Sequence, residues 1–183
     1  MLDMVYMFLA EGFEEIEALC PLDLLRRAGV DVLTVGVGGA DVVSGSHGIA
    51  VKTDINDSEF IYDDVDMVIL PGGMPGTLNL EASDVVMSAV ERAFCEGKFV
   101  CAICAAPSVL GKRGMLCGKE ATCYPGFEKY LEGAKISDKK VVRDGNIITA
   151  AGMGVALDFG LELVSALLGK DKAEEIRSAV IAD

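Results

Sequence analysis

Short apolar runs alternate along the chain with longer stretches whose apolar positions recur every three or four residues. The runs are nearly continuous, which is typical of strands covered on both faces of a parallel sheet. They predict strands at residues 4–10, 30–37, 65–70 and 98–103, with a shorter one at 120–124. Helical spacing, bounded by capping residues and glycines, predicts helices at residues 15–28, 84–96, 156–168 and 172–181, and one that begins near residue 106.

Turn residues interrupt this alternation in two places. Residues 39–54, "GADVVSGSHGIAVKTD", favour a hairpin or small excursion, and residues 139–150 favour a β-hairpin with Asp144-Gly145 at its turn. Repeated strand–helix alternation predicts an α/β fold, in which a largely parallel central sheet carries helices on both faces. With 183 residues and no linker or repeat, residues 1–183 are expected to form a single domain.

Composition narrows the possible functions. A net charge of −13 repels phosphate backbones, so we expect no nucleic-acid partner. No apolar run reaches the roughly 18 residues of a membrane span, and the start of the chain lacks the basic region of a signal peptide. These features predict a cytoplasmic protein with no membrane contact. Its six cysteines are then expected to be reduced, and its single histidine argues against a metal site.

One cysteine, Cys104, stands where a predicted strand runs directly into a helix. The stretch "AICAAPS" has the layout of a nucleophile elbow: small neighbours permit a tight turn, and Pro107 suits the first helical turn. The positive end of the helix would stabilise a thiolate there. A buried structural cysteine is the alternative. A redox pair with Cys101 is rejected, because three strand steps separate the two Cα atoms by roughly 10 Å.

Two further loops reach the same sheet edge, where sites form in α/β proteins. After Leu70, the backbone N–H groups of Gly72 and Gly73 could join that of Ala105 in an oxyanion hole, although "PGG" could also be a plain tight turn. The first strand is followed by "EGFEEIE". Acids at a helix start are ordinary dipole partners, but Glu17 lies one turn inside and could reach Cys104. Only a protonated Glu17 would lower the pKa of that thiol.

Taken together, "AEGFEEIEA", "VILPGGMPG", "AICAAP" and "AGMGVALDFGLELV" resemble the DJ-1/ThiJ branch of the DJ-1/ThiJ/PfpI superfamily, in order and spacing over nearly the whole chain. The resemblance implies a flavodoxin-like three-layer sandwich and a homodimer. It also implies an oxidation-sensitive Cys104 that is hydrogen-bonded by a protonated Glu17, with Gly72, Gly73 and Ala105 lining the pocket. No cofactor is implied.

The departures from the family pattern concern its histidines. Peptidase-like members have a histidine directly after the nucleophile, where this chain has Ala105, so a Cys–His triad is missing. Tyr124 stands where the human-type branch has a pocket histidine before a proline. Beside it, Cys123 is a second pocket thiol or a buried structural one. His47 matches a position near the dimer contact that is often arginine; it is either a loop residue or the one available imidazole.

Two functions use the same residues. As an enzyme, Cys104 would attack an α-oxoaldehyde and Glu17 would shuttle a proton, in a glyoxalase or deglycase reaction. If the protein is instead a non-catalytic redox sensor or a chaperone-like protein, peroxide would oxidise Cys104 and Glu17 would stabilise the oxidised product. The expected partner is therefore a small aldehyde or a peroxide. Peptidase or amidase activity and a role in thiamine biosynthesis are weaker alternatives.

Overall fold

The centre of the molecule is a seven-stranded sheet. The computed structural model describes residues 4–63 and 65–182, and the sheet order in this part of the chain is β10-β11-β7-β6-β1-β2-β5. The strands are β1 (Met4–Leu9), β2 (Asp31–Gly36), β5 (Ile55–Asn56), β6 (Val65–Leu70), β7 (Phe99–Ile103), β10 (Val141–Asp144) and β11 (Ile147–Ala150). Only β10 is antiparallel to its neighbour, so the carboxyl ends of the other six lie at one edge.

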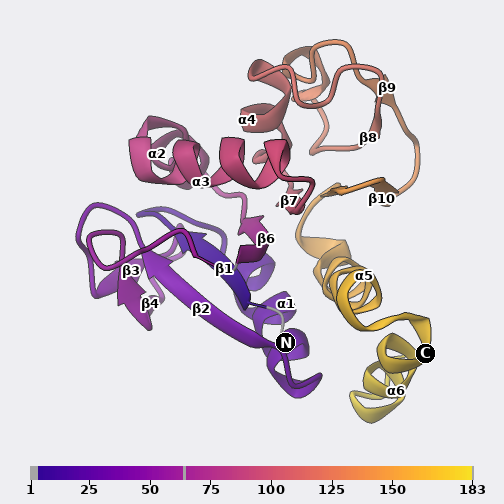
Figure 1. Cartoon of the computed structure of the whole chain (residues 1–183), viewed down its shortest axis with the longest axis horizontal. Helices are drawn as coiled ribbons and strands as arrows, with labels where there is room; N and C mark the ends of the chain where they lie inside the picture. Colours follow the sequence, from indigo (N-terminus) through magenta and orange to yellow (C-terminus); the bar gives the residue numbers. More distant parts are fainter. Residues whose placement is uncertain (1–3, 64, 183) are drawn as a thin grey trace.

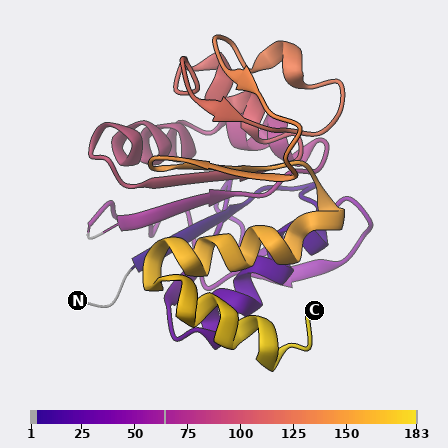
Figure 2. The same cartoon turned by 90° about the vertical axis from the view of Figure 1, so that its right-hand side faces the viewer.

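Helices cover both faces of this sheet, as the alternation predicts (Figures 1 and 2). The helices are α1 (Glu15–Arg27), α2 (Gly76–Ala82), α3 (Asp84–Cys95), α4 (Pro107–Lys112), α5 (Ala156–Leu168) and α6 (Lys170–Ala179). Alternate side chains of β1 point into two separate cores. Val5 and Met7 pack with α1, α5 and α6, whereas Tyr6 and Phe8 pack with α2, α3 and α4. The three-layer α/β sandwich is therefore confirmed.

Smaller elements flank the main sheet. Strands β3 (Val42–Ser44) and β4 (Ala50–Lys52) form the antiparallel hairpin expected within residues 39–54. Strands β8 (Glu120–Ala121) and β9 (Lys135–Ile136) form a short parallel pair, and 3-10 turns lie at Glu128–Tyr130 and Met153–Val155. The β3–β4 hairpin is tied to the first loop, because Gly12 N–H donates to the Ser44 carbonyl at 2.8 Å and Ser46 N–H donates to the Phe13 carbonyl at 2.8 Å.

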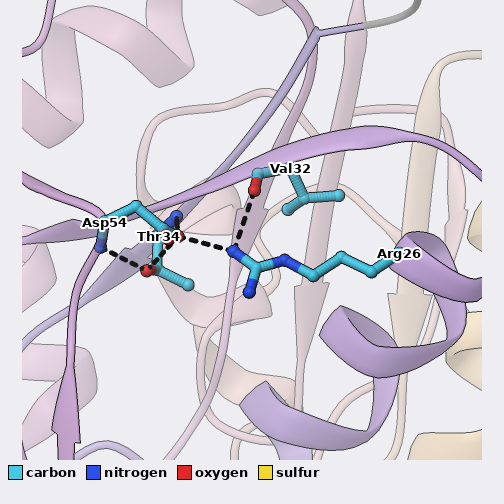
Figure 3. Close-up of polar contacts among 4 residues, drawn as sticks. All are labelled: Arg26, Val32, Thr34 and Asp54. Atoms are coloured by element: carbon cyan, nitrogen blue, oxygen red, sulfur yellow. Dashed lines mark hydrogen bonds and ion pairs between the residues drawn. The ribbon is translucent and has the colours of Figure 1, made fainter.

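A polar cluster joins the end of α1 to β2 and the segment after β4 (Figure 3). The Arg26 guanidinium donates to the Val32 carbonyl at 3.0 Å and to the Asp54 carboxylate at 2.6 Å. The same carboxylate accepts from both the N–H and the hydroxyl of Thr34, at 2.8 and 2.7 Å. These contacts hold α1 against the sheet at the end opposite its N-terminus, which leaves that N-terminus at the carboxyl edge of β1.

Several details differ from the sequence predictions, and one is that the strand expected at residues 120–124 spans only Glu120–Ala121. The 139–150 hairpin turns at Gly145 and Asn146, because Asp144 still pairs with Ile147 in the ladder. Helix α6 begins two residues before position 172, directly after Gly169, and ends two residues before position 181. Helix α2 was not predicted, since its first residue is a glycine that follows Pro75. Among the described residues, no helix is long and apolar enough to cross a membrane.

Candidate active site

Four loops converge at the carboxyl edge of the sheet. Strands β11, β7, β6 and β1 are consecutive neighbours, so the segments that follow them lie side by side. The loops after β1, β6 and β7 were expected to meet there, and they do. The loop after β11, which carries Gly152 and Met153, was missed. The signal for it was the parallel pairing of β11 with β7, which the hairpin pattern alone does not reveal.

Cys104 occupies a strained corner between β7 and α4. Its φ is 65°, a left-handed conformation that is uncommon for a residue with a side chain. Hydrogen bonds hold both sides of the corner: Cys104 N–H donates to the Ala150 carbonyl at 2.8 Å, and Tyr124 N–H donates to the Cys104 carbonyl at 2.8 Å. The surrounding structure thus fixes the backbone so that a half-buried side chain is presented at the sheet edge. The predicted elbow geometry is confirmed.

Only glycine fits at position 72, because the side chains of Glu17 and Cys104 approach its Cα closely. A Cβ at this position would lie 2.5 Å from the Glu17 Oε2 atom and 2.6 Å from the Cys104 Cβ. Gly73 has a φ of 93°, and a Cβ there would lie 2.4 Å from the Glu14 nitrogen. Both glycines of "PGG" therefore allow backbone to approach the site closely, which a plain tight turn does not require.

Glu17 is buried against Cys104 near the start of α1. Its carboxylate accepts from the Gly72 N–H at 3.0 Å, and its backbone N–H donates to the Glu14 carboxylate, the N-cap of α1, at 2.7 Å. Burial raises the pKa of Glu17 to about 7, with the negative charge of Glu14 adding to the effect, although hydrogen bonds to Cys104 and to the N–H groups of Gly72 and Met153 oppose it. Glu17 therefore holds its proton below about pH 7, as the resemblance implied.

The pKa of Cys104 is the main correction to the sequence analysis. A lowered value was expected from the helix N-terminus. Burial instead raises the pKa of Cys104 to about 12, and both the charge of Glu17 and the hydrogen bond to it raise it further, while the N–H groups of Ala105 and Gly73 lower it. Helix α4 has only six residues, so its dipole is weak. The resting side chain is a neutral thiol hydrogen-bonded to Glu17.

The three predicted N–H donors divide between the two side chains. Those of Gly73 and Ala105 face Cys104, whereas that of Gly72 is taken by Glu17. The oxyanion hole proposed from the sequence thus has two of its three members beside the sulfur. The Met153 N–H, which the sequence analysis missed, is a further donor to Glu17.

Tyr124 and His47 have different relations to this site. The Tyr124 ring and the Glu17 carboxylate both lie beside Gly152: a Cβ on Gly152 would be 3.4 Å from Tyr124 Cδ2 and 3.9 Å from Glu17 Oε1. His47 belongs to the loop between β3 and β4 and pairs with Glu15, its Nδ1 lying 2.8 Å from Oε2. The imidazole is therefore engaged by Glu15, outside the contacts that surround Cys104, and its place in a pocket or dimer contact remains a prediction.

Two of the other cysteines, Cys101 and Cys123, are buried. All six are unpaired, and Cys101 is fully buried within β7, which raises its pKa well above the ordinary value. The rejection of a Cys101–Cys104 redox pair is thus consistent with the structure. Burial, with a contribution from Glu128, also raises the pKa of Cys123 to about 11.

Comparison with known proteins places this arrangement in a defined class. A model of the DJ-1/PfpI family matches residues 3–166. Protein dj-1beta of Drosophila melanogaster is 37% identical over 175 residues, which cover 94% of each chain. A Pyrococcus abyssi protein named as a deglycase is 32% identical over 161 residues, covering 86% of this chain and 95% of its own.

Solved structures give the same result for the fold. A mutant DJ-1 superfamily protein from Salmonella typhimurium superposes with a TM-score of 0.95 at 36% identity, covering all of both chains. The structure described as oxidized DJ-1 of Toxoplasma gondii gives 0.94 at 32% identity, covering 98% of each. The fold and site define an α/β protein with a cysteine on an elbow. The chain belongs to the DJ-1/PfpI family.

Proposed function

We propose that this protein protects against carbonyl stress by converting α-oxoaldehydes to α-hydroxy acids, with Cys104 as nucleophile and Glu17 as its proton acceptor. The observation that carries the proposal is the close approach of the Cys104 and Glu17 side chains at a strained strand–helix corner, where a Cβ on Gly72 would lie 2.6 Å from Cys104 Cβ and 2.5 Å from Glu17 Oε2. A nucleophile in contact with a base is the minimum arrangement for covalent catalysis. The deglycase name of the Pyrococcus abyssi relative supports the same class of substrate.

The steps balance without an external oxidant. Ionised Glu17 takes the thiol proton as sulfur bonds to the aldehyde carbon, and the carbonyl electron pair moves to oxygen, toward the N–H groups of Gly73 and Ala105. Glu17 passes that proton to the hemithioacetal oxygen and is again a carboxylate. It then removes the proton from the former aldehyde carbon, which leaves an enediolate, and returns it to the neighbouring ketone carbon while the hydroxyl proton moves to the former ketone oxygen. One carbon is oxidised and the other reduced. Water then cleaves the resulting thioester and frees the hydroxy acid and the thiol.

Lactate formation from methylglyoxal tests this directly. The wild-type protein is compared with Cys104→Ser, and with Cys117→Ser as a matched control at an exposed cysteine. We expect Cys104→Ser to lose at least about 100-fold in kcat/KM, since nucleophilic and acid–base contributions are of that size. The control should retain wild-type activity. Equal lactate formation by all three proteins refutes the enzyme proposal.

A redox sensor that uses Cys104 is the second candidate. Two N–H groups facing the sulfur, those of Gly73 and Ala105, would stabilise a sulfinate, and the oxidized Toxoplasma gondii relative supports such chemistry. The raised pKa of Cys104 weighs against fast oxidation, because the thiolate is the form that reacts. Intact-mass analysis after mild peroxide decides: a sensor gains oxygen at Cys104 before any other cysteine, whereas oxidation elsewhere first excludes that role.

Three accompanying proposals concern the assembly, location and cofactor requirement of the protein. The protein works as a homodimer, in the cytoplasm and without a cofactor. Light scattering at micromolar concentration tests the first, and a monomer mass contradicts it. Localisation of the tagged full chain tests the second. Full activity after dialysis against a chelator is expected for the third, and loss of activity that returns with a metal ion contradicts it.

A further inference from the structure

Three exposed apolar residues flank the reactive pair in the chain segments that surround it. Met74, Tyr124 and Met153 are 47%, 51% and 53% exposed. Large apolar residues this exposed are informative when they cluster at one place, because single ones are scattered over any protein surface. These three come from three different loops, so their proximity to one site is a product of the fold.

Each of them is anchored within one residue of a contact to Cys104 or Glu17. The Met153 N–H donates to the Glu17 carboxylate, and the Tyr124 N–H donates to the Cys104 carbonyl at 2.8 Å. Met74 directly follows Gly73, whose N–H faces the Cys104 sulfur. The backbone of all three residues is therefore held beside the reactive pair, and the Tyr124 ring lies next to Gly152 in the same loop as Met153. We call Met74, Tyr124 and Met153 the apolar rim.

The charges at this site are negative. Glu14 caps α1 beside Glu17, and its charge raises the pKa of Glu17. An anionic substituent on a substrate would be repelled by both carboxylates once Glu17 ionises. A hydroxylated substituent would gain little from two thioethers and the face of an aromatic ring. An alkyl or aryl substituent would bury apolar surface against all three side chains.

We propose that the apolar rim makes this protein selective for α-oxoaldehydes with an uncharged apolar substituent, such as an aryl or branched alkyl group. This inference rests on the proposed function for its substrate class. Half-exposed side chains offer partial burial of an aryl group, so the expected preference for phenylglyoxal over methylglyoxal is about 10-fold in kcat/KM, within the range that one hydrophobic pocket supplies.

The first measurement is that preference itself, with mandelate and lactate as products. We expect the phenylglyoxal-to-methylglyoxal ratio of kcat/KM to fall about 3- to 10-fold in Tyr124→Ala and in Met153→Ala. Tyr124→Phe should keep the wild-type ratio, because it keeps the ring. Leu168→Ala, a comparably exposed apolar residue at the far end of α5, is the matched control and should also keep it.

The second measurement needs no turnover. Alkylation rates of Cys104 are followed by mass spectrometry with iodoacetanilide, iodoacetamide and iodoacetate, each divided by its rate with glutathione. We expect the wild-type protein to react about 5- to 10-fold faster with iodoacetanilide than with iodoacetamide, after correction by the glutathione rates. In Tyr124→Ala this ratio should drop toward one. Iodoacetate should be the slowest of the three reagents. A wild-type ratio near one, or a ratio that both alanine variants leave unchanged, overturns the inference. Absent turnover of both aldehydes overturns the proposed function instead, and the alkylation ratios still decide on the rim.

Discussion

Two glutamates that lie two positions apart in the first turn of α1 have pKa values that shift in opposite directions. Glu15 and Glu17 are both almost fully buried, at 2% and 1% exposure. Burial acts to raise the pKa of Glu15, but hydrogen bonds from the His47 side chain and from backbone N–H groups of Glu15, His47 and Ile49 outweigh it and lower that pKa to about 2. Glu17 faces a thiol and another carboxylate, and its pKa is about 7. Burial alone therefore does not decide whether a carboxyl keeps its proton; its partners do.

This difference assigns the two groups separate tasks. Glu15 is a permanent anion that holds the β3–β4 loop, since its Oε1 accepts the His47 N–H at 2.7 Å. A Cβ on Gly45 would lie 2.4 Å from the same carboxyl, so the loop backbone packs directly on it. Glu17 changes charge near neutral pH while in contact with a nucleophile. We regard Glu15 as structural and Glu17 as reactive.

The largest expected effect is on reactivity in Glu17→Gln. If Glu17 is the proton acceptor, aldehyde turnover falls about 100- to 1000-fold, as for removal of a general base. The alkylation rate of Cys104 with iodoacetamide should rise in the wild type with a midpoint near pH 7, following Glu17, and this step should vanish in the variant. A wild-type rate that is flat from pH 6 to 8 would instead indicate a standing thiolate. Glu15→Gln serves as the matched control and should keep the step.

The next effect is on stability, in the same Glu17→Gln variant. The folded protein retains on Glu17 a proton that the unfolded chain releases with a pKa of 4.5, so folding is disfavoured as pH rises from 4.5 to about 7. The penalty is complete above pH 7 and is on the order of 3 kcal/mol. We expect Glu17→Gln to be more stable than wild type at pH 8 and much closer to it at pH 4.5. Urea unfolding at both values checks this, and an equal difference at the two would contradict it.

Glu15→Gln should act in the opposite direction. Its lowered pKa means that the ionised form stabilises the fold above about pH 4.5, and that this contribution is lost as the pH falls toward 2. The neutral amide also weakens charge-assisted hydrogen bonds to the loop, which costs about 1–3 kcal/mol. Urea unfolding at pH 7 should show this loss, with aldehyde turnover kept. A fully stable Glu15→Gln protein would show that the loop does not depend on the charge.

The smallest effect is expected for His47→Ala. The hydrogen bond to Glu15 raises the pKa of His47, so its contribution is present below about pH 6.5 and is lost as the pH rises through the folded-state value. Because the imidazole is exposed, the thermal midpoint should fall less than in Glu15→Gln, and only at acidic pH. Scanning calorimetry at pH 6 and 9 tests this. Loss of aldehyde turnover in His47→Ala would give the imidazole a role that its position outside the Cys104 contacts does not predict.

The fold was predictable because apolar periodicity and glycine punctuation agree along most of the chain. Strand β6 and helix α5 have the predicted bounds, and α3 begins as predicted, where the Ser83 side chain caps it. Helix α2 escaped because its start carries Gly76 after a proline, a pattern that sequence reasoning assigns to a loop.

The site was predictable in its residues and less so in its electrostatics. Cys104 and Glu17 were identified from an elbow pattern and from a carboxyl one turn into a helix. The ionisation states of Cys104 and Glu17 could not be predicted from the sequence. They depend on how deeply each side chain is buried, and on the Gly72 and Met153 N–H groups facing Glu17 rather than Cys104. Those N–H directions are set by loops that β6 and β11 bring together across about 80 residues of chain.

The left-handed torsion at Cys104 has a practical consequence for anyone who needs an inactive version of this protein. Alanine or serine at this position inherits the unfavourable backbone together with the deletion of sulfur, whereas glycine adopts the same angles freely. Cys104→Gly should therefore be the more robust reference for experiments in living cells, where a poorly folded comparison protein is degraded and mimics loss of function.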